Sequence, residues 1–208
     1  MYLKKSLFVT LFAMFALAAC GGAENGHNAM AAEPMGNAEP ATEPVAGTSQ
    51  LGGGTVEEVH PGTGGSPHVK ATWTVDDANI SITYGRPFLK DRVVGESVEP
   101  MGDQVWRLGA DEATTLVTDR DLMLGSAHVP AGEYTLFTQR MDGEFHLIIN
   151  SETGQWGLSH NAEHDVAHAA MEVSELSPPA DQLTFVIEDG SLGFEWGQMK
   201  ATVPLMVH

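Results

Sequence analysis

Val69-Lys70-Ala71-Thr72-Trp73-Thr74-Val75 and Ile80-Ser81-Ile82-Thr83-Tyr84, joined by Asp76-Asp77-Ala78-Asn79, form the stretch that decides the class of fold. Apolar and polar residues alternate in both runs, which is the period of two expected of half-buried β-strands. The four residues between the runs are typical of a tight turn. The stretch therefore predicts an antiparallel pair of strands at the start of the folded domain.

Short apolar runs separated by turn residues continue through the rest of the chain. Further strands are expected over residues 114–118, 122–124, 133–139, 145–150, 166–173, 183–188, 192–196 and 201–207. Asp142-Gly143 and Asp189-Gly190 lie between such runs and suit hairpin turns that need positive φ. No long helical period separates the strands, as a parallel sheet would require. We therefore expect an all-β fold, an antiparallel β-sandwich or jelly roll, as a single domain over residues 66–208.

The N-terminus has the pattern of an export signal. Lys4 and Lys5 precede an apolar run that is too short to span a bilayer. The run ends in Leu17-Ala18-Ala19-Cys20, small residues before a cysteine, as in bacterial lipoproteins. We expect residues 1–19 to be a signal peptide and Cys20 to be lipidated. The membrane would then be a partner through this lipid, and the protein would lie in the cell envelope, on its periplasmic or extracellular face.

Residues 20–65 are rich in Gly, Ala, Glu, Pro, Asn and Thr and hold almost no large apolar side chains. Such a composition buries too little surface to offset chain entropy. We expect a disordered acidic tether that ends near Ser66.

Charge and cysteine content limit the functions that fit. The chain carries 10 basic and 28 acidic residues, a net charge of −18, so it repels nucleic acid and no nucleic-acid partner is expected. Cys20 is the single cysteine. Once it is lipidated, disulfides, thiolate metal sites and cysteine nucleophiles are excluded.

The stretch Trp106-Arg107-Leu108-Gly109-Ala110-Asp111-Glu112-Ala113-Thr114-Thr115 is the leading candidate site. The planar fork of Arg107 suits bidentate pairing with a carboxylate. In the preferred interpretation Arg107 clamps Asp111, Glu112 or another loop carboxylate and stabilises the fold. In the alternative, Trp106 and Arg107 line a cleft for an anionic or sugar ligand.

His160, His164 and His168 form the densest group of potential metal ligands, with Glu163 and Asp165 beside them. Their spacing of four places all three on one face of either a helix or a strand. Such a set would suit zinc, copper or nickel. The alternative is a solvated loop entering a strand, where the histidines do not converge. We expect no cofactor, with a divalent transition metal as the alternative.

Several motifs are shared with a known family. In chain order they are Ser66-Pro67, Tyr84-Gly85-Arg86-Pro87 followed by Arg92, Trp106-Arg107-Leu108-Gly109-Ala110 running to Thr114-Thr115, Pro130-Ala131-Gly132-Glu133-Tyr134-Thr135-Leu136-Phe137, Trp156-Gly157 and Asp165-Val166. Through them the chain resembles DUF2911, a bacterial family of exported proteins and lipoproteins. The family usually has asparagine at the position of Asp111 and a basic residue at that of His168. The resemblance implies no activity.

The usual enzyme motifs, such as G-x-S-x-G, G-x-x-x-x-G-K, H-E-x-x-H and C-x-x-C, are absent from the sequence. We therefore expect a non-catalytic, lipid-anchored binding or interaction module for a small molecule, a glycan or an envelope protein. One alternative is a hydrolase or isomerase with a site around Trp106, Arg107, Asp111 and Glu112. The other is a metal-binding protein that uses the three histidines.

Overall fold

The computed structural model describes residues 49–208 and confirms an all-β, antiparallel fold. The expected signal peptide, Cys20 and the first part of the expected tether lie outside the described residues. Within them the strands are β1 (Ser49–Leu51), β2 (Gly54–His60), β3 (His68–Val75), β4 (Ala78–Gly85), β5 (Thr114–Thr118), β6 (Leu122–Leu124), β7 (Ala127–Val129), β8 (Gly132–Met141), β9 (Glu144–Asn150), β10 (Asp165–Glu188) and β11 (Ser191–Val207). One 3₁₀ turn, η1 (Ala162–His164), precedes β10. No helix of this part of the chain has the length and hydrophobicity to cross a membrane.

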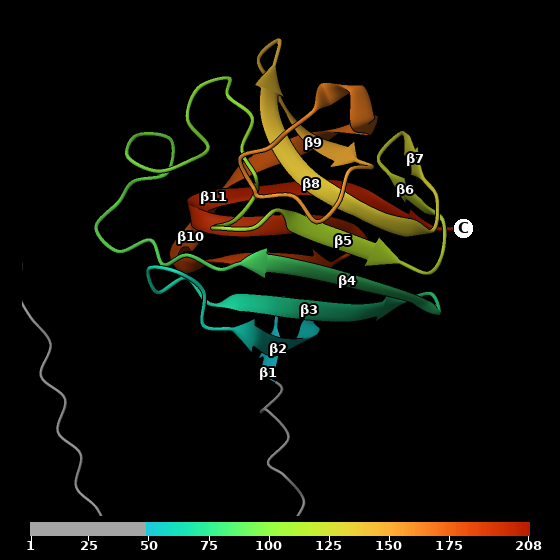
Figure 1. Cartoon of the computed structure of the whole chain (residues 1–208), viewed down its shortest axis with the longest axis horizontal. Helices are drawn as coiled ribbons and strands as arrows, with labels where there is room; N and C mark the ends of the chain where they lie inside the picture. The colour runs from blue at the N-terminus through green and yellow to red at the C-terminus, as the bar shows by residue number, and fades with distance from the viewer. Residues whose placement is uncertain (1–48) are drawn as a thin grey trace, which may run out of the picture. The chain divides into compact units, whose positions relative to one another are not determined.

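The strands form one sheet in the order β1-β2-β3-β4-β5-β8-β9-β10-β11-β6-β7 (Figure 1). The far end of β10 comes back to the first strands. Leu183 donates its backbone N–H to the carbonyl of Pro87 at 3.1 Å, and Ile187 donates to that of Gly52, also at 3.1 Å. The sheet therefore curls over, and its first strands and the far end of β10 enclose a common core.

The alternation that predicted β3 and β4 is borne out by burial. Ile80, Ile82 and Tyr84 are fully buried, and Trp73 is 4% exposed. Tyr84 meets Phe185 of β10 edge to face, with ring centroids 4.8 Å apart. The buried face of the β3–β4 hairpin is thus covered by the returning end of β10, and this contact closes the core.

The expected tether was too long, because β1 and β2 lie within it. Val56 of β2 pairs with Ala71 of β3 and is 6% exposed, and the indole of Trp73 donates to the carbonyl of Gly52 at 2.8 Å. The composition hid this strand because β2 is nearly all exposed beyond Val56. The folded part therefore includes residues from Ser49 on, rather than beginning near Ser66.

Two pairs of expected strands are continuous in the structure. Residues 166–173 and 183–188 both belong to β10, and residues 192–196 and 201–207 both belong to β11. Pro178-Pro179 lies inside β10 within the register shift between Glu175 and Ala180, and both of its side chains are exposed. Proline is tolerated at such bulges because no ladder hydrogen bond is required there.

Candidate functional site

The loop between β4 and β5, residues 86–113, projects from the sheet (Figure 1). It carries most of the leading candidate site of the sequence analysis, from Trp106 on. Trp106 anchors it, because its backbone exchanges two hydrogen bonds of 2.8 Å with Thr138 of β8. The Trp106 ring is 6% exposed and meets Phe194 edge to face at 5.6 Å. The loop is thus fixed to the core at the residue that precedes Arg107.

The chain turns sharply after Arg107. Leu108 and Asp111 have φ values of 55° and 62°, in the left-handed region that costs energy for residues other than glycine. The Thr114 hydroxyl donates to the carbonyl of Leu108 at 3.0 Å, and Ala110 donates its N–H to the carbonyl of Gly85 at 3.2 Å. These bonds hold the turn against the end of β4.

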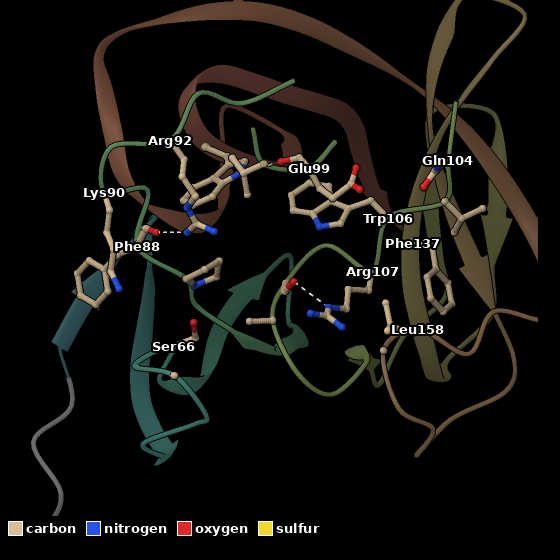
Figure 2. Close-up of a pocket in the computed structure, with 18 of the residues that line it drawn as sticks. Ser66, Phe88, Lys90, Arg92, Glu99, Gln104, Trp106, Arg107, Phe137 and Leu158 are labelled. Atoms are coloured by element: carbon tan, nitrogen blue, oxygen red, sulfur yellow. Dashed lines mark hydrogen bonds between the residues drawn. The ribbon is translucent and has the colours of Figure 1, made fainter. Parts of the chain in front are cut away.

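A cleft of about 620 Å³ opens beside this turn (Figure 2). Trp106 and Arg107 lie at its centre, with Phe88 and Arg92 on one side and Leu158 on the other. Phe88 and Leu158 are 45% and 78% exposed, so the cleft also presents two apolar side chains to solvent. Further lining residues include Ser66, Lys90, Glu99, Gln104, Phe137 and His160.

Cations dominate the polar lining of this cleft. Its lining includes the three cations Lys90, Arg92 and Arg107 and a single carboxylate, that of Glu99. The Nε atoms of Arg107 and Arg92 donate to the backbone carbonyls of Gly109 and Leu89, each at 3.1 Å. Within residues 49–208 none of the three cations forms an ion pair. The clamp that we expected between Arg107 and a loop carboxylate is therefore not formed, and the alternative of a cleft is the one that the geometry supports.

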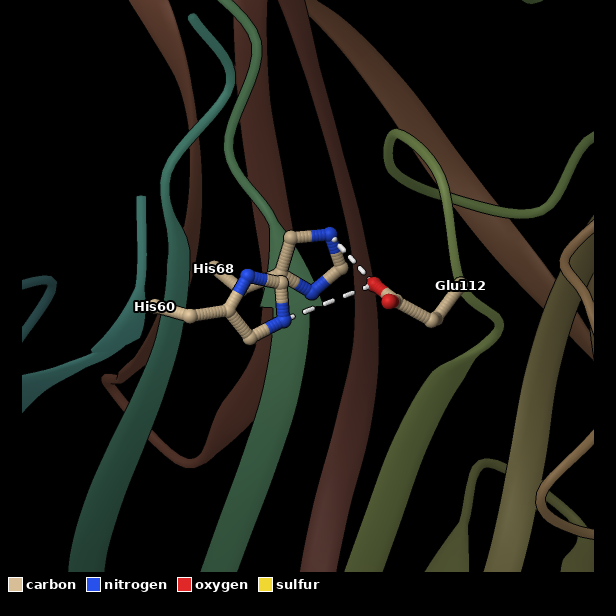
Figure 3. Close-up of side chains that lie close together, drawn as sticks. All are labelled: His60, His68 and Glu112. Carbon is tan, nitrogen blue, oxygen red and sulfur yellow. Dashed lines mark ion pairs between the residues drawn. The ribbon is translucent and has the colours of Figure 1, made fainter. Parts of the chain in front are cut away.

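The structure separates Asp111 and Glu112 from Trp106 and Arg107. Neither carboxylate lines the cleft, and both lie close to His68, the first residue of β3. Figure 3 shows Glu112 in this position. Oε2 of Glu112 lies 2.7 Å from Nε2 of His68 and 3.7 Å from Nε2 of His60. Oδ2 of Asp111 lies 3.8 Å from Nε2 of His68 and accepts the backbone N–H of Thr63 at 3.0 Å. The sequence analysis placed Trp106, Arg107, Asp111 and Glu112 around one site. In the structure the first two line the cleft and the last two contact His68.

The environment of His68 is unusual. His68 is 3% exposed, and its Nε2 has no hydrogen-bond partner, since the contact with Glu112 lies outside hydrogen-bond geometry. Burial lowers the pKa of His68 below its ordinary value; Glu112 opposes this shift, His60 adds to it, and Asp111 opposes it less. The net direction favours a neutral imidazole.

The three histidines of the expected metal site are not all brought together. Nε2 of His160 lies 2.9 Å from Oδ1 of Asp165, and Nε2 of His168 lies 3.3 Å from Oδ2 of the same carboxylate. His164 is exposed in η1. Within residues 49–208, the three residues whose ligand atoms all lie within 4.8 Å of one another are His60, His68 and Glu112. His160 instead packs edge to face on Phe137, 4.8 Å away, and lines the cleft.

Sequence reasoning missed His60 and His68. One signal could have found them, since the two histidines flank a Pro- and Gly-rich turn that a hairpin would use. Their register as cross-strand partners depends on β2 being a strand. Because residues 20–65 were assigned to a tether, His60 was never considered.

The fold and its cleft define an all-β domain with a basic, aromatic-lined site in an acidic chain. The chain belongs to the family described as Protein of unknown function (DUF2911), which matches residues 66–205. Trp106, Arg107 and Glu112 lie within the match, and His60 lies before it. No curated protein and no solved structure matches the chain.

Proposed function

We propose that the domain is a binding module whose cleft takes a small organic anion with an apolar part. The observation that carries this proposal is the Arg107 guanidinium, which lies beside Trp106 without a carboxylate partner. Arginine binds carboxylates and phosphates bidentately, and an aromatic wall adds apolar contact to the rest of the ligand. Three cations in a cleft of a chain with net charge −18 concentrate anions locally.

The same geometry favours binding over hydrolysis or isomerisation. An acid–base mechanism needs a carboxylate or histidine positioned on the reacting atoms. Asp111 and Glu112 face His68 instead of the cleft. Two ionisable acid–base groups do line the cleft, and both are engaged elsewhere: Glu99 accepts the backbone N–H of Met101, and Nε2 of His160 lies 2.9 Å from Oδ1 of Asp165. The arrangement therefore supports a non-catalytic role.

We also propose that the chain is a lipoprotein of the cell envelope, anchored through Cys20. The support is Leu17-Ala18-Ala19-Cys20 after a short apolar run. A Cys20→Ser variant should stay unlipidated and should not undergo the lipoprotein-specific cleavage. Normal processing and unchanged detergent partitioning of Cys20→Ser would contradict the anchor.

The cleft is tested with 8-anilinonaphthalene-1-sulfonate, an aromatic anion whose fluorescence rises in an apolar site. Its neutral relative N-phenyl-1-naphthylamine has the same rings without the sulfonate. Arg107→Gln should weaken binding of the anion by about tenfold or more, because a charge-assisted hydrogen bond is worth about 1.5–3 kcal/mol. The neutral dye should be affected little.

Arg120→Gln is the matched control, since Arg120 is exposed and lies outside the cleft while the net charge changes equally. If Arg107→Gln and Arg120→Gln bind the anion alike, general charge rather than the cleft accounts for the binding. That result would contradict the proposed function.

A further inference from the structure

His60, His68 and Glu112 come from separate elements that meet at one end of the sheet. His60 ends β2, His68 begins β3, and the two residues are cross-strand partners around the turn 61–67. Glu112 belongs to the loop that precedes β5. In Figure 3 the carboxylate of Glu112 points at both imidazoles.

Gly85 makes this meeting possible. It is the β4 partner of His68, and a Cβ built on it would lie 2.8 Å from Nε2 of His68 and 2.1 Å from the carbonyl oxygen of Ala110. Any larger residue would separate the loop that carries Glu112 from the histidine. The absence of a side chain therefore lets a carboxylate and a buried imidazole share a small space.

We propose that His60, His68 and Glu112 bind a divalent transition metal ion of the zinc class. Their ligand atoms lie within 4.8 Å of one another, with the shortest pair at 2.7 Å. Zinc bonds of about 2.0–2.1 Å at tetrahedral angles place neighbouring ligand atoms roughly 3.3 Å apart, inside this range. Two imidazoles with carboxylates form a donor set that zinc accepts.

A second and independent observation is the unpartnered nitrogen of His68. Nε2 is buried, lacks a hydrogen bond and points toward the two carboxylates. A buried polar atom without a partner is costly, and a bound cation would remove that cost. The ion would also offset the two negative charges of Asp111 and Glu112. The Glu112 side chain is 49% exposed, which leaves a route of entry.

Asp111 and His60 would contribute to the site in different ways. Asp111, held by the N–H of Thr63, would be a fourth ligand or an outer partner. His60 is stacked on His68, with centroids 4.3 Å apart, and its Nδ1 accepts the N–H of Gly62 at 3.1 Å. Coordination through Nε2 puts the ring proton on Nδ1 and breaks that bond. The His60 side chain is 44% exposed, so the ring has room to turn.

The test is calorimetric titration of the full chain, purified metal-free in mild detergent, with Zn²⁺ alone. We expect one ion to bind per chain through this site. Asp111→Asn should weaken its affinity by about 10- to 100-fold, the range typical of outer-shell partners. Glu112→Gln and His60→Gln remove proposed ligands and should each cost at least as much. Circular dichroism of each variant without metal checks that it folds.

A His164→Gln, His168→Gln double variant is the matched control, because it removes two imidazoles from the other histidine group. Its affinity should stay within about twofold of the parent. Zinc should also raise the melting temperature of the parent and the control, and should raise that of Glu112→Gln much less at the same zinc concentration, as RT ln(1 + [L]/Kd) requires. Absence of zinc binding, or binding that Glu112→Gln leaves unchanged, would overturn the proposal. Loss of binding in the double variant would assign the ion to the other group.

Discussion

Nε of Arg107 donates to the carbonyl oxygen of Gly109, 3.1 Å away and only two residues along the chain. This local bond leaves the outer nitrogens of the guanidinium available to the cleft that Arg107 lines. Arg86 presents the opposite case, because its guanidinium donates to the carbonyl of Leu183 and the hydroxyl of Thr184, each at 3.0 Å. Arg86 thereby joins β4 to the returning end of β10.

The two arginines should therefore respond differently to truncation. Arg107→Ala should lower the free energy of unfolding by about 1.5 kcal/mol, the low end for a charge-assisted hydrogen bond, since one such bond to a loop carbonyl is lost. Arg86→Ala removes two charge-assisted bonds between distant strands and should cost about 3 kcal/mol. Urea denaturation of both variants gives the comparison. An Arg107→Ala protein as unstable as Arg86→Ala would restore the clamp that the sequence favoured.

Removal of residues 1–64 should destabilise the domain, in contrast to what a tether ending near Ser66 would imply. The deletion takes away β2, with its buried Val56, and the carbonyl of Gly52 that the Trp73 indole donates to. Burying one valine is worth about 1.5–3 kcal/mol, and a lost partner for a buried donor adds a further 1–3 kcal/mol. A loss of about 3 kcal/mol corresponds to roughly 6–12 °C in melting temperature for a domain of this size.

The matched control for that deletion is a protein that lacks residues 1–48 and keeps both strands. It should melt within a degree or two of the full chain. Differential scanning calorimetry of the two shortened proteins measures the difference directly. Equal melting temperatures would mean that β1 and β2 contribute nothing to the folded domain.

The class of fold was predictable because the alternation over residues 69–84 reflects a simple physical cause, one buried and one solvated face. The same principle failed for β2, where Glu57, Glu58 and Val59 are all exposed and only Val56 and Gly54 are buried. An outer strand of this kind is held by its ladder with β3, which leaves little trace in composition. Polar bias alone therefore does not separate such a strand from a tether.

The candidate sites, like the fold, were predictable from the sequence only in part. Trp106 and Arg107 lie four or five residues from Asp111, so their shared loop was visible in the sequence, and one of the two interpretations was the cleft. Which way each side chain turns depends on the positive φ of Leu108 and Asp111. The contact of His60 with Glu112 depends on strand register and on the small size of Gly85. Neither of these can be derived from residue spacing.

The metal-free protein should lose stability as the pH falls below 6.5. Burial holds the pKa of His68 below that ordinary value in the folded state. Between the two pKa values the unfolded chain binds more protons, so the free energy of unfolding rises with pH there and levels off above 6.5. His68→Gln should flatten this slope, measured by urea denaturation in the presence of a chelator.

His164→Gln is the control for that experiment, because His164 is exposed in η1 and its side chain forms no ion pair among the residues that the structure describes. Its slope below pH 6.5 should match the parent's. If His68→Gln also keeps the parent's slope, the imidazole of His68 is not held neutral in the folded protein.

Gly85→Ala should disturb both sites at once, because Gly85 is in contact with the loop that joins them. The added methyl would lie 2.1 Å from the carbonyl oxygen of Ala110, a backbone atom that cannot move without shifting residues 107–112. Overpacking of this kind costs about 1–3 kcal/mol. The displaced loop would also carry Arg107 and Glu112 away from their present positions, so dye binding in the cleft and zinc affinity should both fall.

Gly132→Ala is the matched control, since its Cβ would lie 3.2 Å from the hydroxyl of Tyr134, the far end of a side chain that can give way. Its cost should be smaller than that of Gly85→Ala, and both binding readouts should stay at the parent level. Three measurements on the two variants decide the matter: urea denaturation, dye titration and zinc titration. If Gly85→Ala is as stable as Gly132→Ala and binds both probes like the parent, the close approach of β4 to the loop is not what positions Glu112 and Arg107. The two sites would then have to be regarded as independent of this glycine.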